Sequence, residues 1–179
     1  MPEKAGFGIK DSGSSKAAGT IATEPIAQIQ NPKSRILAGT LLAFDFGTRR
    51  IGIAVGNTIS ATANPLITID DERNEVRFAT IGALIKEWQP AALVVGLPCN
   101  DDGTPHELTA LCRRFANRLK GRFDLPTLLV DERYTSAAAS SALDERGIHG
   151  RKQKPLLDQY AAQQILQAYF DEPSAGIPA

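Results

Sequence analysis

Five short apolar runs, each bounded by polar residues or glycine, divide the chain from residue 36 onward. Runs of this length between turn-forming neighbours are typical of buried β-strands. They predict strands over residues 41–46, 51–55, 63–69, 92–96 and 127–130. The links between the first three runs are too short for crossovers, so we expect antiparallel strands there. The later strands follow helices, so we expect them to be parallel.

Apolar residues at helical spacing predict four helices between and after these strands. The segments are residues 75–88, 107–120, 137–145 and 157–170. Pro90 ends the first helix and Gly121 is the predicted C-cap of the second. This order of elements predicts an α/β fold in which helices cover both faces of a mixed five-stranded sheet.

The two ends of the chain differ in composition from its centre. Residues 1–35 are rich in Gly, Ser, Ala and Pro without sustained periodicity, which predicts a disordered tail. Residues 36–171 are then one domain, and residues 172–179 a flexible C-terminal tail. No run approaches the roughly 20 apolar residues of a membrane span. The N-terminus also lacks the hydrophobic core of a signal peptide, so we expect a cytoplasmic protein without a membrane partner.

Charge and cysteine content narrow the choice of function. The chain has 179 residues, of which 20 are basic and 20 acidic, so its formal net charge is zero. A global basic field of the kind found in many nucleic-acid binders is therefore absent, and binding would need a local patch. Cys99 and Cys112 show no metal-ligand spacing and predict reduced thiols. Cys112 lies on an apolar helical face and is expected in the core.

Acidic residues fall where the predicted topology can bring them together. Asp45 lies near the carboxyl end of the first strand, Asp131 and Glu132 end the last strand, and Asp158 opens the final helix. In such sheets, sites gather at the carboxyl ends of the parallel strands. Each acid also has a structural interpretation. Asp45 could cap a turn, Asp131 or Glu132 could pair with Arg133, and Asp158 could be a first-turn acid favoured by the helix dipole.

Clustered carboxylates repel one another and ionise together only with a cation between them. Mg²⁺ or Mn²⁺ prefers oxygen ligands and shares its coordination with phosphate. Two such ions about 4 Å apart can promote phosphodiester cleavage. The basic residues near these acids in the sequence are Arg49, Arg50, Arg133, Arg151, Lys152 and Lys154. They could hold a nucleic-acid backbone, or they could simply form a solvated loop surface.

Five motifs, in the same order, closely resemble the YqgF (RuvX) family. They are DFGTRRIGIA at residues 45–54, VGLP at 95–98, DGT at 102–104, DERYTS at 131–136 and DQYAA at 158–162. The resemblance covers nearly the whole predicted domain. It implies a ribonuclease H-like fold and a nuclease that matures the 5′ end of the 16S rRNA precursor, in a family also labelled a Holliday-junction resolvase. Tyr134 and Gln159 depart from the expected motif residues without affecting the acidic set.

The resemblance also implies roles for particular residues. Asp45, Glu132 and Asp158 would be the catalytic and metal-binding acids, with Mg²⁺ or Mn²⁺ as the cofactor. Asp131 is the less favoured choice for the second acid. Asp101 and Asp102 stay open as well, because ribonuclease H-like nucleases also place an acid after the middle strand.

We therefore expect a metal-dependent phosphodiesterase acting on structured nucleic acid, with pre-16S rRNA favoured over branched DNA. One rival is an actin-like sugar kinase or ATPase, which would need a second comparable domain. Another is a non-catalytic rRNA-binding assembly factor. His106 and His149 are candidate proton shuttles or ordinary surface histidines. The oligomeric state stays open between monomer and homodimer, although a junction resolvase would normally be a dimer.

Overall fold

The computed structural model describes residues 37–98, 107–132 and 153–179. All of them belong to one compact unit, residues 31–179. The tail expected over residues 1–35 and the helix expected over residues 137–145 lie outside the described residues.

Six strands form one mixed sheet in the order β3-β2-β1-β4-β5-β6. In chain order they are β1 (Thr40–Phe46), β2 (Arg50–Asn57), β3 (Thr62–Asp70), β4 (Ala92–Leu97), β5 (Thr127–Asp131) and β6 (Ile177–Pro178). β2 pairs antiparallel with both β1 and β3, whereas β4 pairs parallel with both β1 and β5. The predicted mixed sheet and its strand directions are therefore confirmed.

The sixth strand corrects the predicted strand count. β6 pairs antiparallel with β5, with Leu129 opposite Ile177 and Leu128 opposite Pro178. It lies within the segment expected to be a flexible tail, directly after a short 3₁₀ helix, η2 (Pro173–Ala175). A two-residue strand is too short to produce a periodic pattern, and a proline is tolerated because this strand lies at the sheet edge.

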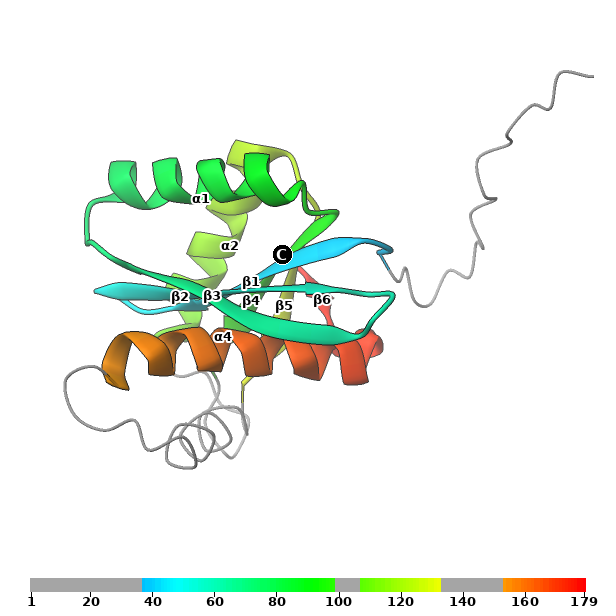
Figure 1. Ribbon diagram of the computed structural model, residues 1–179. Helices are drawn as coiled ribbons and strands as arrows, with labels where there is room; N and C mark the ends of the chain where they lie inside the picture. The colour runs from blue at the N-terminus through cyan, green and yellow to red at the C-terminus, as the bar shows by residue number, and fades with distance from the viewer. Residues whose placement is uncertain (1–36, 99–106, 133–152) are drawn as a thin grey trace, which may run out of the picture. The chain divides into compact units, whose positions relative to one another are not determined.

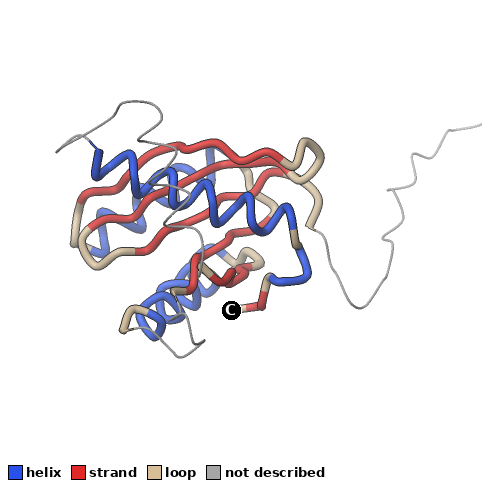
Figure 2. Tube along the Cα trace, turned by 90° about the horizontal axis from the view of Figure 1, so that it is seen from below, coloured by secondary structure: helices blue, strands red, loops and turns tan. Residues whose placement is uncertain are grey.

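Three helices lie among the described residues: α1 (Asn74–Trp88), α2 (Thr109–Phe123) and α4 (Gln153–Asp171). α1 and α2 cover one face of the sheet and α4 covers the other (Figure 1). The view from below shows α4 lying across the strands (Figure 2). None of these described helices combines the length and apolar character that crossing a bilayer requires.

The end of α2 differs from the prediction. Its C-cap is Asp124, with a left-handed φ of 52°, so Gly121 lies inside the helix. Aspartate adopts this conformation more readily than most residues other than glycine. Taking Gly121 as the C-cap therefore predicts a helix end at residue 120, three residues before the observed end at Phe123.

Side-chain alternation along β1 divides the core between the two faces. Leu42 and Phe44 pack in the cluster beneath α1 and α2, whereas Leu41 and Ala43 pack in the cluster beneath α4. Cys112 is 1% exposed in the first cluster, as predicted. Continuing the alternation by one step assigns the next residue, Asp45, to the face that α4 covers.

Candidate functional site

Asp45 lies at the carboxyl end of β1 between two glycines. Gly52 is its partner on β2. On the other side Phe44 pairs with Val95 of β4, so Gly96 is the next residue along that strand. Glycine has no side chain, and both neighbours therefore leave room around the Asp45 carboxylate for another segment of the chain.

That room is filled by the other two predicted acids. A Cβ atom at Gly52 would overlap the backbone of Asp158, and one at Gly96 would overlap the Glu132 carboxylate. Gly52 thus allows α4 to approach the sheet closely, and Gly96 allows Glu132 to lie against β4. The fold brings Asp45, Glu132 and Asp158 to one end of the sheet.

Strand alternation distinguishes Glu132 from Asp131. Leu129 packs in the cluster beneath α1 and α2, and Val130 packs in the cluster beneath α4. Asp131 therefore returns to the α1/α2 face, where it is exposed, while Glu132 follows Val130 toward α4. The Glu132 amide donates to the Leu97 carbonyl at 3.2 Å, which continues the β4–β5 pairing. The geometry favours Glu132 over Asp131 as the acid beside Asp45.

Burial and mutual repulsion disfavour the ionised forms of two of these acids. Burial, followed by the nearby Asp158 carboxylate, raises the pKa of Asp45 to about 7, against a smaller lowering by Arg50. Burial, followed by the charges of Asp45 and Asp131, raises the pKa of Glu132 to about 8. The surroundings of the site therefore do not stabilise all of its carboxylates in the ionised form. A bound cation would stabilise the ionised carboxylates.

Asp158 is held by Arg50. The Arg50 Nε lies 2.5 Å from Asp158 Oδ2, and the two side chains are only 24% and 19% exposed. α4 begins at Gln153, four residues before the predicted start, so Asp158 is its sixth residue. The predicted stabilisation by the helix dipole is therefore wrong, because that effect is confined to the first turn. The Arg50 guanidinium provides the compensation instead, and the pairing raises the pKa of Arg50.

The positions of these side chains can be compared with what the predicted metal site requires. Within residues 37–98, 107–132 and 153–179, no three His, Cys, Asp or Glu side chains stand close enough together to hold a metal ion. Asp158, the acid that α4 contributes, is engaged by Arg50. The donor chemistry still suits Mg²⁺ or Mn²⁺, since the three groups are carboxylates and two of them have raised pKa values.

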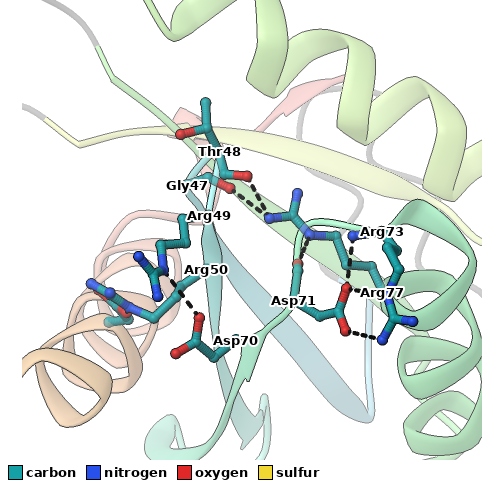
Figure 3. A network of polar contacts seen from close by, with 9 residues as sticks. Gly47, Thr48, Arg49, Arg50, Asp70, Asp71, Arg73 and Arg77 are labelled. Carbon is teal, nitrogen blue, oxygen red and sulfur yellow. Dashed lines mark hydrogen bonds and ion pairs between the residues drawn. The ribbon is translucent and has the colours of Figure 1, made fainter.

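A buried arginine, which the sequence analysis did not single out, holds the turn that follows Asp45. Arg77 of α1 is 4% exposed. Its Nη2 donates to the Thr48 carbonyl at 2.6 Å and to the Gly47 carbonyl at 3.5 Å, and its Nε donates to the Asp71 carbonyl (Figure 3). Its guanidinium carbon also lies 5.8 Å from the centre of the Phe46 ring. Arg77 thereby fixes the β1–β2 turn in place.

A signal for Arg77 was present in the sequence. It lies four and seven residues before Ile81 and Leu84, so it continues the apolar stripe of α1. The side chain of a single Lys or Arg on such a stripe either reaches out so that its charged end contacts water, or it donates hydrogen bonds to buried acceptors. Here it binds the carbonyls of the turn.

The predicted nucleic-acid-binding cations lie in three situations. Arg49 is exposed, with its Nε 3.5 Å from the Asp70 carboxylate, a separation worth little energetically (Figure 3). Lys154 is exposed in the first turn of α4, and Arg50 is paired with Asp158. The remaining predicted site residues lie outside the described residues: Asp101, Asp102, His106, Arg133, His149, Arg151 and Lys152.

Comparison with known proteins gives consistent matches. The family model "RuvX: Holliday junction resolvase" matches residues 39–172. A Chromobacterium violaceum protein described as "Putative pre-16S rRNA nuclease" is 61% identical over 137 residues, which cover 76% of this chain and 100% of the relative. Proteins with the same description from Methylobacillus flagellatus and Nitrosomonas eutropha are 60% and 55% identical. They cover 74% and 82% of this chain, and 91% and 94% of their own length is matched.

A solved structure, T. thermophilus RuvC in complex with a Holliday junction substrate, has a TM-score of 0.49 to this chain. It is 18% identical, and the match covers 78% of this chain and 99% of that one. A likeness at this level adds nothing to the family match.

The raised pKa of Asp45 predicts a pH-dependent stability. A folded-state pKa near 7 means that the folded protein holds a proton that the unfolded chain releases near pH 4. The stabilisation is complete below about pH 4 and is lost as the pH rises through about 7. Asp45→Asn removes this loss, so we expect it to raise the free energy of unfolding at pH 8 by about 2–4 kcal/mol relative to wild type.

Denaturant unfolding at pH 5 and pH 8 measures this difference. Asp124→Asn is the matched control, because Asp124 is exposed at the end of α2 and asparagine tolerates its left-handed backbone. An unchanged pH dependence in Asp45→Asn would contradict the burial argument.

The overlap at Gly96 makes a second prediction. In Gly96→Ala the new methyl group displaces the Glu132 carboxylate toward water, so the Glu132 pKa should fall from about 8 toward its ordinary value. Carboxyl ¹³C NMR titration measures this pKa directly. Gly121→Ala is the control, because nothing lies within 4 Å of a Cβ there, and it should leave Glu132 unchanged while stabilising α2 by up to about 1 kcal/mol.

Proposed function

Because this chain belongs to the RuvX family, we propose that it is a metal-dependent nuclease that hydrolyses phosphodiester bonds in structured nucleic acid, with the 16S rRNA precursor as its substrate. A relative that is 61% identical is described as "Putative pre-16S rRNA nuclease", which favours RNA. The family description favours a four-way DNA junction as the second candidate substrate. Processing of ribosomal RNA would make the protein cytoplasmic.

The placement of Asp45, Glu132 and Asp158 at one end of the sheet carries the proposal. These acids are separated from one another in the sequence. Because Gly52 and Gly96 have no side chains, the backbone of Asp158 and the Glu132 carboxylate can lie against the sheet there. Keeping Asp45 and Glu132 half-buried with raised pKa values is costly for the fold. Groups with strongly perturbed pKa values cluster at functional sites, and these acids lie at the carboxyl ends of parallel strands.

Asp45, Glu132 and Asp158 are the residues that would hold Mg²⁺ or Mn²⁺. Such an ion, when bound, lowers the pKa of a water nucleophile and stabilises the charge that develops on the phosphate. The chain itself positions these acids. Arg77 fixes the turn that follows Asp45. Gly52 and Gly96 allow Asp158 and Glu132 to lie close to the sheet. The protons on Asp45 and Glu132 near neutral pH make occupancy pH-dependent.

Cleavage assays test the proposal. The substrates are an end-labelled 16S rRNA precursor fragment and a four-way DNA junction, each with Mg²⁺ or Mn²⁺. We expect wild type to cut the RNA, and Asp45→Asn, Glu132→Gln and Asp158→Asn each to reduce kcat by on the order of 100-fold or more, because each removes an oxygen ligand and a negative charge. EDTA should abolish cleavage in the wild type.

Asp131→Asn is the matched control for Glu132→Gln, because Asp131 lies on the opposite face of the sheet and should leave cleavage largely intact. Cutting of the junction but not the RNA would select the second substrate. Binding of RNA without cleavage, unaffected by Asp45→Asn and by EDTA, would replace the nuclease with a non-catalytic assembly factor.

A further inference from the structure

The outer face of α2 carries a concentration of positive charge outside the proposed acidic site. Its exposed cations are Arg113, Arg114, Arg118, Lys120 and Arg122, and α2 contains no acidic residue. The rest of the chain has 15 basic and 20 acidic residues. The formal net charge of zero therefore combines a positively charged α2 with a negatively charged remainder. The opposite side of α2 packs Cys112, Phe115 and Leu119 into the core, which fixes the charged side outward.

Among the described residues, none of these cations forms a salt bridge with an Asp or Glu side chain. Lys120 donates to a main-chain oxygen of Ala179 at 2.5 Å, and the Arg122 guanidinium lies 5.0 Å from the centre of the Phe78 ring. The ring contact leaves the charge of Arg122 unneutralised. Arg114, Arg118 and Arg122 also follow one another at intervals of four residues, a spacing at which like charges destabilise a helix. An ordinary solvated helix mixes both signs of charge, so this face is suited to a polyanion.

The position of α2 connects this face to the acidic site. Thr109, the first residue of α2, donates its hydroxyl to the Pro98 carbonyl at 2.6 Å, directly after β4. Burial, followed by the charges of Glu132 and Asp45, raises the pKa of Cys112, so the first turn of α2 lies close enough to these acids to be affected by their charge. From there the helix runs for 15 residues, or roughly 22 Å, away from the site.

The chemistry of the face indicates what it binds. Arg114, Arg118 and Arg122 form a row with a rise of about 6 Å per step, which is comparable to the spacing of successive phosphates along a strand. None of the exposed side chains of α2 is aromatic, so the face offers no platform for stacking unpaired bases. A row of cations without stacking groups is suited to contacting the phosphate backbone, and such contacts carry no sequence information.

We infer that the exposed face of α2 binds the phosphate backbone of the double-helical part of the substrate adjoining the cleavage site. This inference rests on the proposed function for the identity of the nucleic acid, but it concerns binding and not the chemical step. The face would orient a structured substrate with respect to the three acids and would contribute affinity that depends strongly on salt.

The test measures binding without cleavage. The protein carries Asp45→Asn and the buffer contains EDTA, so that no cleavage occurs. Its affinity for an RNA duplex of about 20 base pairs, which is longer than α2, is measured across a series of salt concentrations. The triple variant Arg114→Gln, Arg118→Gln, Arg122→Gln should bind on the order of 100-fold more weakly at 0.1 M salt, with a salt slope lower by about 2–3. Glutamine keeps the helix propensity, and thermal unfolding verifies the fold.

Two controls define the result. Changing the same three residues to lysine should retain the salt slope, because the charge is kept. Lys86→Gln, at the exposed end of α1, should bind like the background protein. The inference is overturned if the folded triple glutamine variant binds with unchanged affinity and salt slope, even where wild type cleaves. If wild type cleaves nothing but binding still depends on α2, the proposed nuclease fails and the binding face stands.

Discussion

The burial of negative charge at the end of β1 is the constraint on which the rest of this site depends. Asp45 is flanked in the sheet by Gly52 and Gly96, which have no side chains. Those vacancies admit the backbone of α4 and the carboxylate of Glu132. Burial, followed by repulsion from neighbouring carboxylates, disfavours the ionised forms of Asp45 and Glu132 and raises the pKa values of both. Strongly perturbed pKa values of this kind cluster at functional sites.

Two arginines make the arrangement possible, and they do so differently. Arg50 pairs with Asp158 and so compensates one of the three charges directly. Arg77 donates to backbone carbonyls and so fixes the turn between β1 and β2. The first bond joins residues 108 positions apart and the second joins residues about 30 apart. The geometry of the site is therefore a property of the whole sheet and its helices.

Much of the fold could be predicted because its signals are local. Strand-length apolar runs gave the five main strands, and connection lengths gave their directions. Errors came where the deciding interaction is not local. The sequence predicts that Asp158 lies in the first turn of a helix starting at residue 157, but α4 starts four residues before that, at Gln153, and Arg50 holds the Asp158 carboxylate. β6 exists because two residues pair with β5, a contact that leaves no periodic trace. Arg77 was missed because its partners are backbone carbonyls of a distant turn.

The sequence by itself determined the α/β class, the strand directions and the candidate acids, because alternation, spacing and turn residues act over a few positions. Only the tertiary structure gives a reason to favour Glu132 over Asp131 as the acid beside Asp45, because that preference depends on which sheet face α4 covers. It also decided that Arg50 is engaged with an acid, and that the cations of α2 form an outward face. Charge partners and burial depend on elements that meet in space, and sequence spacing does not encode these distances.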